Sequence, residues 1–167
     1  DGTQFIALRG SSSQGATSPD GINWTARTLP STANWKAGTS GAGVSIGYGV
    51  SSTSAISSPD GINWTARTLP ATGVWTGVAF GSGKFVMISS GSTQLASSTD
   101  GLTWSSQFLP TSGSWQGITF GGGQFLIVES GTTNAYTSPD GNTWTARSLP
   151  VSANWKPVAF GANMYVA

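Results

Sequence analysis

The sequence predicts an all-β protein built from a repeated unit of four antiparallel strands. A set of motifs returns every 40 residues, and each unit contains four short segments rich in aromatic, β-branched and hydroxyl residues. No stretch shows the periodicity of an amphipathic helix, and 24 glycines in 167 residues are too many for helices of ordinary length. These observations together favour a repetitive β architecture.

Three markers define the repeat. A tetrapeptide with the sequence Ser-Pro-Asp-Gly or Ser-Thr-Asp-Gly occupies residues 18–21, 58–61, 98–101 and 138–141. A tryptophan follows each tetrapeptide, at Trp24, Trp64, Trp104 and Trp144. A second tryptophan series stands at Trp35, Trp75, Trp115 and Trp155. No insertion or deletion interrupts the spacing, so any position can be compared with its equivalents in the other units.

The third unit shows the expected strands most clearly. They are residues 75–80, 84–89, 92–97 and 102–109, separated by Gly, Ser and Asp-Gly turn signals. A unit of this length with four antiparallel strands matches one blade of a β-propeller, in which blades pack face to face around an axis. Both faces of a blade are then buried, which explains the unbroken apolar run at residues 85–88. A β-solenoid or a sandwich is the alternative, although solenoid coils usually have shorter repeats.

We expect one propeller or part of one, with blades at residues 1–34, 35–74, 75–114 and 115–154. Residues 155–167 either close the ring or start a further blade. Residues 1–7 align with residues 161–167, so a ring that closes by pairing 155–160 with 4–8 leaves the last seven residues redundant. This predicts a longer array, or a dimer in which residues 155–160 of one copy complete the opening blade of the other in an eight-bladed ring.

Composition excludes several classes of function. Charged residues are 8% of the chain and the formal net charge is +1. The chain therefore lacks the positive electrostatic field that would attract the phosphate backbone of a nucleic acid. The absence of Cys and His removes disulfides, thiolate nucleophiles, the usual zinc sites and imidazole acid–base chemistry. No apolar run approaches the ~18 residues of a membrane helix. We therefore expect no metal, no cofactor, no nucleic-acid partner and no membrane insertion.

The tetrapeptide has a structural explanation. Pro sets φ for the first turn position, Asp accepts hydrogen bonds from turn amides, and Gly supplies a positive φ. The motif resembles the Ser/Thr-x-Asp-x-Gly-x-Thr-Trp motif of Asp-box, or BNR-repeat, propellers, most closely at residues 138–144, although Asp and Gly are adjacent here and the motif is one residue shorter. The shorter form is similar to sialidase-like repeats of bacterial secreted and phage tail-associated proteins.

This resemblance implies a structural role for the box residues. They are Ser18, Asp20, Gly21, Trp24, Ser58, Asp60, Gly61, Trp64, Ser98, Asp100, Gly101, Trp104, Ser138, Asp140, Gly141 and Trp144.

The acidic and basic residues argue against catalysis. A glycosidase needs two carboxylates ~5–10 Å apart or a Tyr nucleophile with an acidic partner, and sialidase-like sites also need an arginine cluster. Only Asp1 and Glu129 lie outside the boxes. The repeated arginines should be spread around the rim. We therefore expect no catalytic residues and no enzyme activity.

Glycan binding is the leading functional hypothesis, because aromatic faces stack on sugar rings and hydroxyl and amide side chains match sugar hydroxyls. Repetition would provide several weak sites that act together. The candidate contacts are Trp35, Trp75, Trp115, Trp155, Asn34, Asn154, Arg27, Arg67 and Arg147. In the alternative interpretation, these tryptophans fill gaps between blades and the arginines pack along tryptophan faces.

The second unit lacks bulk at positions where the third has large side chains. Phe80, Phe85 and Met87 align with small residues, which are Ser40, Ser45 and Gly47. This blade could contain a pocket, or it could be repacked around Tyr48 and Val50.

We therefore expect a non-catalytic recognition module with several sites that bind glycans or cell-surface polysaccharide. We expect it to be extracellular, on a cell surface or on a virion. One alternative is a structural spacer of a phage tail, capsid or surface filament without a small ligand. Another is a fragment of a sialidase-like glycosidase.

Overall fold

The computed structural model describes residues 4–167, and its regular elements are strands. This confirms the all-β class that the repeat predicts. Among these residues there is no helix with the length and apolar character that crossing a membrane requires.

The strands form four antiparallel sheets in which each strand pairs with its neighbours in the chain. The first sheet contains β1 (Phe5–Leu8), β2 (Ser12–Ser18) and β3 (Thr25–Ala33). The second contains β4 (Trp35–Gly41), β5 (Val44–Gly49), β6 (Ser52–Ser58), β7 (Thr65–Gly81), β8 (Lys84–Ser90), β9 (Ser92–Ser98) and β10 (Ser105–Gly113). The third contains β11 (Trp115–Gly121), β12 (Gln124–Glu129), β13 (Thr132–Ser138) and β14 (Thr145–Ala153). The last is the hairpin of β15 (Ala159–Gly161) and β16 (Met164–Val166).

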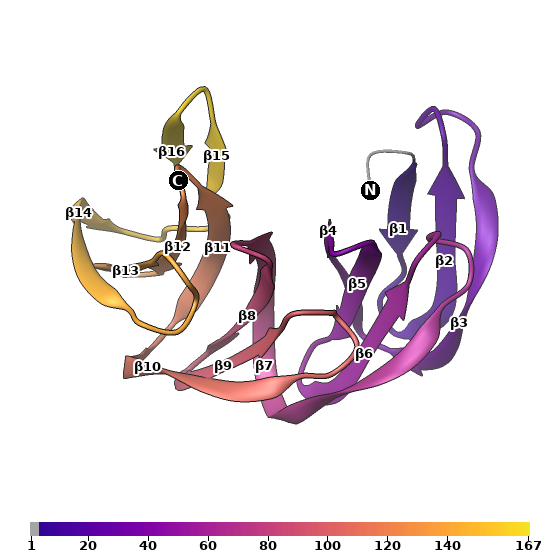
Figure 1. Ribbon diagram of the computed structural model, residues 1–167, viewed down its shortest axis with the longest axis horizontal. Coiled ribbons are helices and arrows are strands. Elements are labelled where there is room, and N and C mark those ends of the chain that lie inside the picture. The colour runs from indigo at the N-terminus through magenta and orange to yellow at the C-terminus, as the bar shows by residue number, and fades with distance from the viewer. Residues whose placement is uncertain (1–3) are drawn as a thin grey trace.

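The sheets lie along an arc, with the first sheet at one end and the β15–β16 hairpin at the other (Figure 1). Strands β4 and β11, which open their units, lie on the concave side. Strands β3, β10 and β14, which end their units, lie on the convex side. This arrangement follows the order of strands in propeller blades. The β-propeller class is supported, whereas a closed ring of four blades is not confirmed.

The expected closure of the ring does not occur among the described residues. Strand β1 pairs with β2, and β15 pairs with β16. The last residues supply β16 of this hairpin. Within the segment 155–160, residues 155–158 are not in a strand, and Ala159 and Phe160 belong to β15. The expected pairing of this segment with the opening blade of a second copy stays a prediction. Asp1, Gly2 and Thr3, which took part in the predicted overlap, lie outside the described residues.

Strand β7 is 17 residues long and passes from the second unit into the third without a break. Asn34, Ser114 and Asn154 interrupt the strand at the aligned positions of the other units. Val74 occupies this position in β7, and a β-branched residue favours extended backbone. The second and third units therefore share one seven-stranded sheet.

The box tetrapeptide closes its own turn. The Oδ1 atom of Asp20 accepts hydrogen bonds from the N–H groups of Ile22 and Asn23, both at 2.8 Å. The hydroxyl of Ser18 donates to Asp20 and accepts from the N–H of Gly21, whose φ is +73°. The same carboxylate contacts return at Asp60, Asp100 and Asp140.

This turn moves one predicted strand boundary. The expected strand at residues 102–109 begins instead at Ser105 and runs to Gly113. The N–H groups of Leu102 and Thr103 bond to Asp100, at 2.8 and 3.0 Å, so these two residues belong to the turn.

Candidate functional site: a pocket between the first and second units

The predicted stacking tryptophans are in the interior. Trp35 is 2% exposed, Trp75 is 1% exposed and Trp115 is not exposed. Their rings offer no face to a sugar, so these three predicted contacts are wrong. Trp155 is half-buried. The spacing in the sequence shows where the tryptophans recur. It does not show which face of each strand packs against the next sheet, so it could not show that these rings are buried.

These tryptophans join consecutive units instead. The indole N–H of Trp75 donates to the carbonyl of Ser52 in the preceding unit, at 3.0 Å. Trp115 donates to Ser92 in the same way, at 3.1 Å. Trp155 donates to the carbonyl of Thr132, also at 3.1 Å. A buried indole with its N–H satisfied contributes packing and orientation together, so this tryptophan series is a structural device.

The other candidate contacts do not converge. The Nε of each arginine donates to a hydroxyl of the adjacent strand in its own unit: Arg27 to Thr17, Arg67 to Ser57 and Arg147 to Thr137, at 2.8–3.1 Å. The guanidinium groups are thus fixed along separate sheets. Asn34 and Asn154 are exposed and lie at the connections between units.

The acidic residues also have structural partners. Glu129 is 8% exposed, and its carboxylate accepts hydrogen bonds from the N–H of Ser114, the hydroxyl of Thr132 and the amide of Asn134, at 2.7–2.9 Å. Backbone N–H donors in the boxes lower the pKa of Asp20, Asp60 and Asp100, and they lower the pKa of Asp140 to about 2. These carboxylates remain ionised at neutral pH. Asp1, the remaining acid, lies outside the described residues.

The third and fourth units each contain a cluster of three aromatic rings that meet in tilted or edge-to-face pairs. In the third, the ring centroids of Phe80 and Phe85 are 4.6 Å apart, and those of Phe85 and Trp104 are 6.2 Å apart. In the fourth unit the same pairs are 4.8 and 6.4 Å apart. The box tryptophan is 7% exposed in the third unit and 8% in the fourth. Phenyl rings therefore fill the space in front of this tryptophan.

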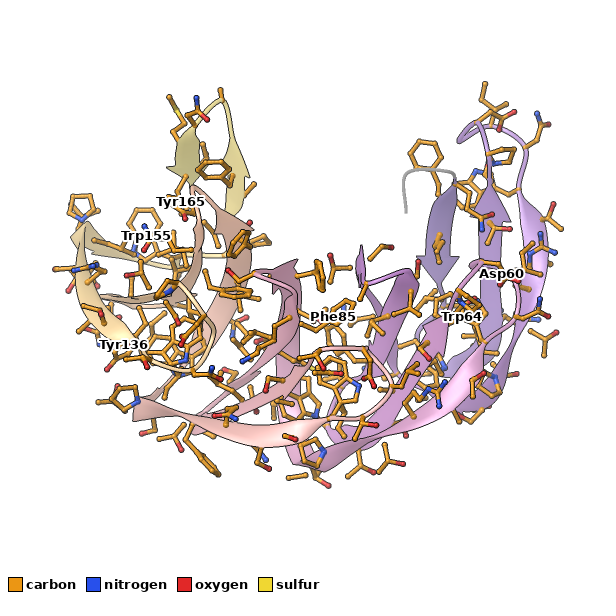
Figure 2. The ribbon with its side chains drawn as sticks, in the orientation of Figure 1. Asp60, Trp64, Phe85, Tyr136, Trp155 and Tyr165 are labelled. Atoms are coloured by element: carbon orange, nitrogen blue, oxygen red, sulfur yellow. The ribbon has the colours of Figure 1, made fainter. Side chains whose placement is uncertain are left out.

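In the second unit two hydroxyls replace the two phenyl rings, and a cavity of about 250 Å³ lies in this space. The hydroxyl oxygens of Ser40 and Ser45 are 2.8 Å apart and share a hydrogen bond. The box tryptophan, Trp64, is half-buried and lines the cavity. We call this cavity the Trp64 pocket. Figure 2 shows Trp64 near Asp60, on the side of the molecule occupied by the first sheet.

The lining of the Trp64 pocket comes from both units and carries no formal charge. It comprises Gln4, Phe5, Ile6, Leu8, Gly38, Thr39, Ser40, Ser45, Ile46 and Trp64. The indole N–H of Trp64 is already bonded to the carbonyl of Gly61, at 2.9 Å, so its ring rather than its N–H is available. The side-chain amide of Gln4 donates to the carbonyl of Asp60, which joins the two units at the edge of the pocket.

The third small residue of this unit does not contribute to the cavity. A Cβ on Gly47 would lie 2.5 Å from Leu8 and 2.9 Å from Ile56, so neighbouring side chains occupy the space that Met87 fills in the third unit. Tyr48 belongs to the core cluster of Trp75 and Phe85. Both sequence alternatives are thus realised in different places: the unit is repacked near Gly47 and hollow near Ser40 and Ser45.

Comparisons with known proteins identify the architecture. No known family profile matches the chain. No curated protein matches it. Among solved structures, a virginiamycin B lyase from Staphylococcus aureus has a TM-score of 0.79 at 16% identity, over 92% of this chain and 55% of that one. YCF48 bound to D1 peptide has a TM-score of 0.69 at 17% identity, over 97% and 55%. A luciferin-regenerating enzyme has a TM-score of 0.64 at 14% identity, over 96% and 63%.

These structures are β-propellers, so at this identity they support the fold alone. The chain spans about half the length of the lyases. The assignment to Asp-box sialidase-like repeats is not confirmed by them.

The expectation that the chain is not an enzyme is corrected by the same structures. They include a lyase and a luciferin-regenerating enzyme, so propellers of this shape carry catalysis in other proteins. The expectation rested on missing His and Cys residues and on the acids that a glycosidase needs. Those templates cover only part of the chemistry that a propeller can support.

Proposed function

We propose that the chain recognises glycans and that the Trp64 pocket holds one sugar residue. The observation that carries the proposal is the replacement of two packed phenyl rings by the hydroxyls of Ser40 and Ser45 in front of Trp64. An indole face and two hydroxyls are thereby brought to the same cavity.

The chemistry of the lining supports a sugar. A pyranose has a C–H face that packs on an aromatic ring and an edge of hydroxyls that donate and accept hydrogen bonds. Ile6 and Leu8 extend the apolar side, while Thr39 adds a hydroxyl to the polar side. The bond between the two serines uses one hydroxyl proton, which leaves the other proton and further lone pairs for a ligand.

The volume and the charge of the Trp64 pocket narrow the class of sugar that it would hold. A cavity of about 250 Å³ is below the ~300–1,000 Å³ of sites for drug-sized ligands, which favours a single ring over a buried oligosaccharide. The uncharged lining offers no ionic partner, which favours a neutral sugar. Phenyl rings fill the equivalent space in the third and fourth units, so several sites would require several copies of the chain. The setting that suits such a module is a cell surface, a virion or the extracellular medium.

The test is a glycan array followed by calorimetric titration of the neutral sugars that bind. Ser45→Phe restores the ring of the other units and fills the pocket, so we expect it to lower affinity at least tenfold without loss of stability. Ser106→Phe makes the same change at an exposed position outside the pocket and should bind as the parent does. Equal binding by the parent and Ser45→Phe would contradict the assignment of the site. Mass analysis of the recovered sugar reports whether it is bound unchanged or converted.

A structural spacer is the second candidate, and one specific observation favours it. Trp75, Trp115 and Trp155 link each unit to the preceding one through hydrogen bonds to backbone carbonyls. This makes a stiff array without requiring a ligand. The spacer is favoured if every glycan on the glycan array that binds the parent also binds Ser45→Phe, or if none binds the parent.

A further inference from the structure

A second cavity lies on the concave side of the arc, where β4, the second part of β7 and β11 are neighbours (Figure 1). Its volume is about 190 Å³, and no residue of the first sheet or of the β15–β16 hairpin lines it. Three glycines form part of its wall. The side chains that line it are apolar at Val78, Ile118 and Val158 and polar at Tyr48, Thr76 and Gln116. We call this cavity the Tyr48 cavity.

Tyr48 brings a phenol hydroxyl to a position that is aliphatic in the other units. The aligned residues are Leu8, Ile88 and Val128. Tyr48 is 4% exposed, burial alone raises the pKa of its phenol, and its hydroxyl has no hydrogen-bond partner among the described residues. A buried hydroxyl without a partner destabilises the fold unless solvent or a ligand accepts its proton. The Tyr48 cavity provides the space for such an acceptor.

Two lysines lie beside the Tyr48 cavity. Lys36 on β4 is the cross-strand partner of Tyr48 on β5, so the two side chains project from the same face of the sheet. Lys156 directly precedes Pro157 of the lining, and its carbonyl oxygen would lie 2.7 Å from an ideal Cβ on Gly117, another lining residue. Both lysine side chains are exposed. Positive charge therefore flanks the cavity on two units.

The carboxylates of the described residues do not balance this charge. The box aspartates belong to turns that follow the third strand of each unit, and in the second unit this turn begins after Ser58. Tyr48 pairs with Ala55, farther from the turn along the same strand. Glu129 is aligned with the entry to its unit, but its carboxylate already accepts three hydrogen bonds. An anion in the Tyr48 cavity thus meets no acidic side chain in the lining.

We propose that the Tyr48 cavity binds the carboxylate of a small aliphatic acid. The Tyr48 hydroxyl donates to a carboxylate oxygen, and a hydrogen bond to an ionised acceptor is roughly twice as strong as one between neutral groups. Lys36 and Lys156 attract the anion through solvent, over a range of about 8–10 Å at ordinary ionic strength. This site is separate from the Trp64 pocket, with which it shares only Gly38 of the lining, and it does not depend on glycan binding.

The walls and the size of the Tyr48 cavity select among acids. Val78, Ile118 and Val158 present methyl groups, which favour a hydrocarbon tail over a second charged group. A phosphate has more acceptor oxygens than the phenol and the Gln116 amide can satisfy. A volume of about 190 Å³ is below the ~300–1,000 Å³ of sites for drug-sized ligands, so the tail is short.

The test is an NMR titration of the parent with sodium propionate, and with propionamide as a neutral molecule of similar shape. We expect propionate to shift the amide signals of Gly77 and Gly117 in a saturable way. Propionamide should bind about tenfold more weakly, because a hydrogen bond to a charged group accounts for that difference. Tyr48→Phe keeps the ring and removes the donor, so it should lower the affinity for propionate to a similar extent.

Tyr136→Phe is the matched control. Tyr136 is 7% exposed in the fourth unit and does not line the Tyr48 cavity, so this variant should bind propionate as the parent does. Ser45→Phe fills the Trp64 pocket and should also leave propionate binding unchanged, which separates this site from the proposed glycan site.

Lys36→Met tests the contribution of charge at an exposed position. It should weaken propionate binding at low salt and matter less at high salt, where the charge is screened. Thermal unfolding of each variant confirms that weaker binding is not loss of fold. The proposal is overturned if the parent shows no saturable binding of propionate, or if Tyr48→Phe binds propionate equally well. Equal binding of propionamide, or tighter binding of inorganic phosphate, would overturn the assigned ligand class.

Discussion

The second and third units share their box geometry and the pairing register of their last three strands, yet they differ in what lies in front of the box tryptophan. In the third, the ring of Phe85 packs at a tilt between those of Phe80 and Trp104, whereas the second has two serine hydroxyls and a cavity of about 250 Å³ beside Trp64. The strands and the turn carboxylate are in place in both. The backbone of a unit therefore depends on its turn and its sheet, whereas the side chains in front of the box tryptophan can differ from unit to unit.

The strongest test of this comparison converts the third unit into the second. Phe85 is fully buried, so Phe85→Ser should cost about 3–5 kcal/mol of unfolding free energy, since it removes a ring that contacts two other rings. The same position in the second unit already holds a small residue, and Ser45→Ala should cost less than about 1 kcal/mol. Urea unfolding followed by tryptophan fluorescence measures both. Similar losses for the two variants would mean that the units do not differ in packing as described.

The box tryptophan should matter according to its burial in each unit. Trp104→Ala should cost about 3 kcal/mol, at the low end for a buried tryptophan, because its N–H is buried with no hydrogen-bond partner among the described residues. Trp24 is 47% exposed, so Trp24→Ala should cost less than about 1 kcal/mol. Denaturant midpoints at equal slope give both values. A Trp24 variant as destabilised as the Trp104 variant would show that the first unit is packed in solution as the third is.

The box carboxylates of the third and fourth units should contribute similar stability, and the contribution should vanish in acid. Asp140→Ala should cost about 1–2 kcal/mol near neutral pH, because it removes the acceptor of two turn amides. The N–H groups of Thr143 and Asn142 lower its pKa from 3.8 to about 2. Because the folded state holds the proton less tightly than the unfolded state, this stability is complete above the unfolded pKa and is lost as the pH falls toward about 2.

Unfolding of the parent and Asp140→Ala in urea, at neutral pH and at acid pH, measures this difference. The gap between the two proteins should close in acid. A gap that is independent of pH would exclude the carboxylate as its source. Asp100→Ala should behave in the same way, because the box of the third unit makes the same bonds.

The smallest expected effect concerns Tyr48 in the second unit. Burial raises the pKa of its phenol to about 12. A folded pKa above the unfolded value of 10.0 means that stability is lost as the pH rises between these values. Tyr48→Phe should therefore change stability by less than about 1 kcal/mol at neutral pH and make the alkaline loss shallower. Ultraviolet titration of the phenol checks the pKa, and an unchanged alkaline profile in Tyr48→Phe would refute its role.

The repeat made most of the fold predictable, because a fixed spacing places strands and turns at known positions. It could not place the join at Val74, since the continuity of β7 depends on one β-branched residue where the other units carry Asn or Ser. It also placed the start of β10 too early, because the box turn extends past the glycine.

The site was predictable only in part. The substitutions at Ser40 and Ser45 marked the pocket in the aligned sequence, but the same argument applied to Gly47, where Leu8 and Ile56 fill the space. Which of these positions is hollow therefore depends on a side chain of the neighbouring sheet, Leu8, as well as on one of the same sheet, Ile56. The tryptophans at the unit entries were misassigned for a related reason, since their burial is set by the neighbouring unit.

Strand β7 has a consequence for how the molecule opens. Its first part pairs with β6 and its second part with β8, so a single backbone belongs to both units. If the two units opened separately, so that amide protons exchanged in β6 but not in β8, strand β7 would have to separate into two parts. The second and third units should therefore behave as one cooperative block in hydrogen exchange, while the first sheet and the β15–β16 hairpin open independently at lower free energy.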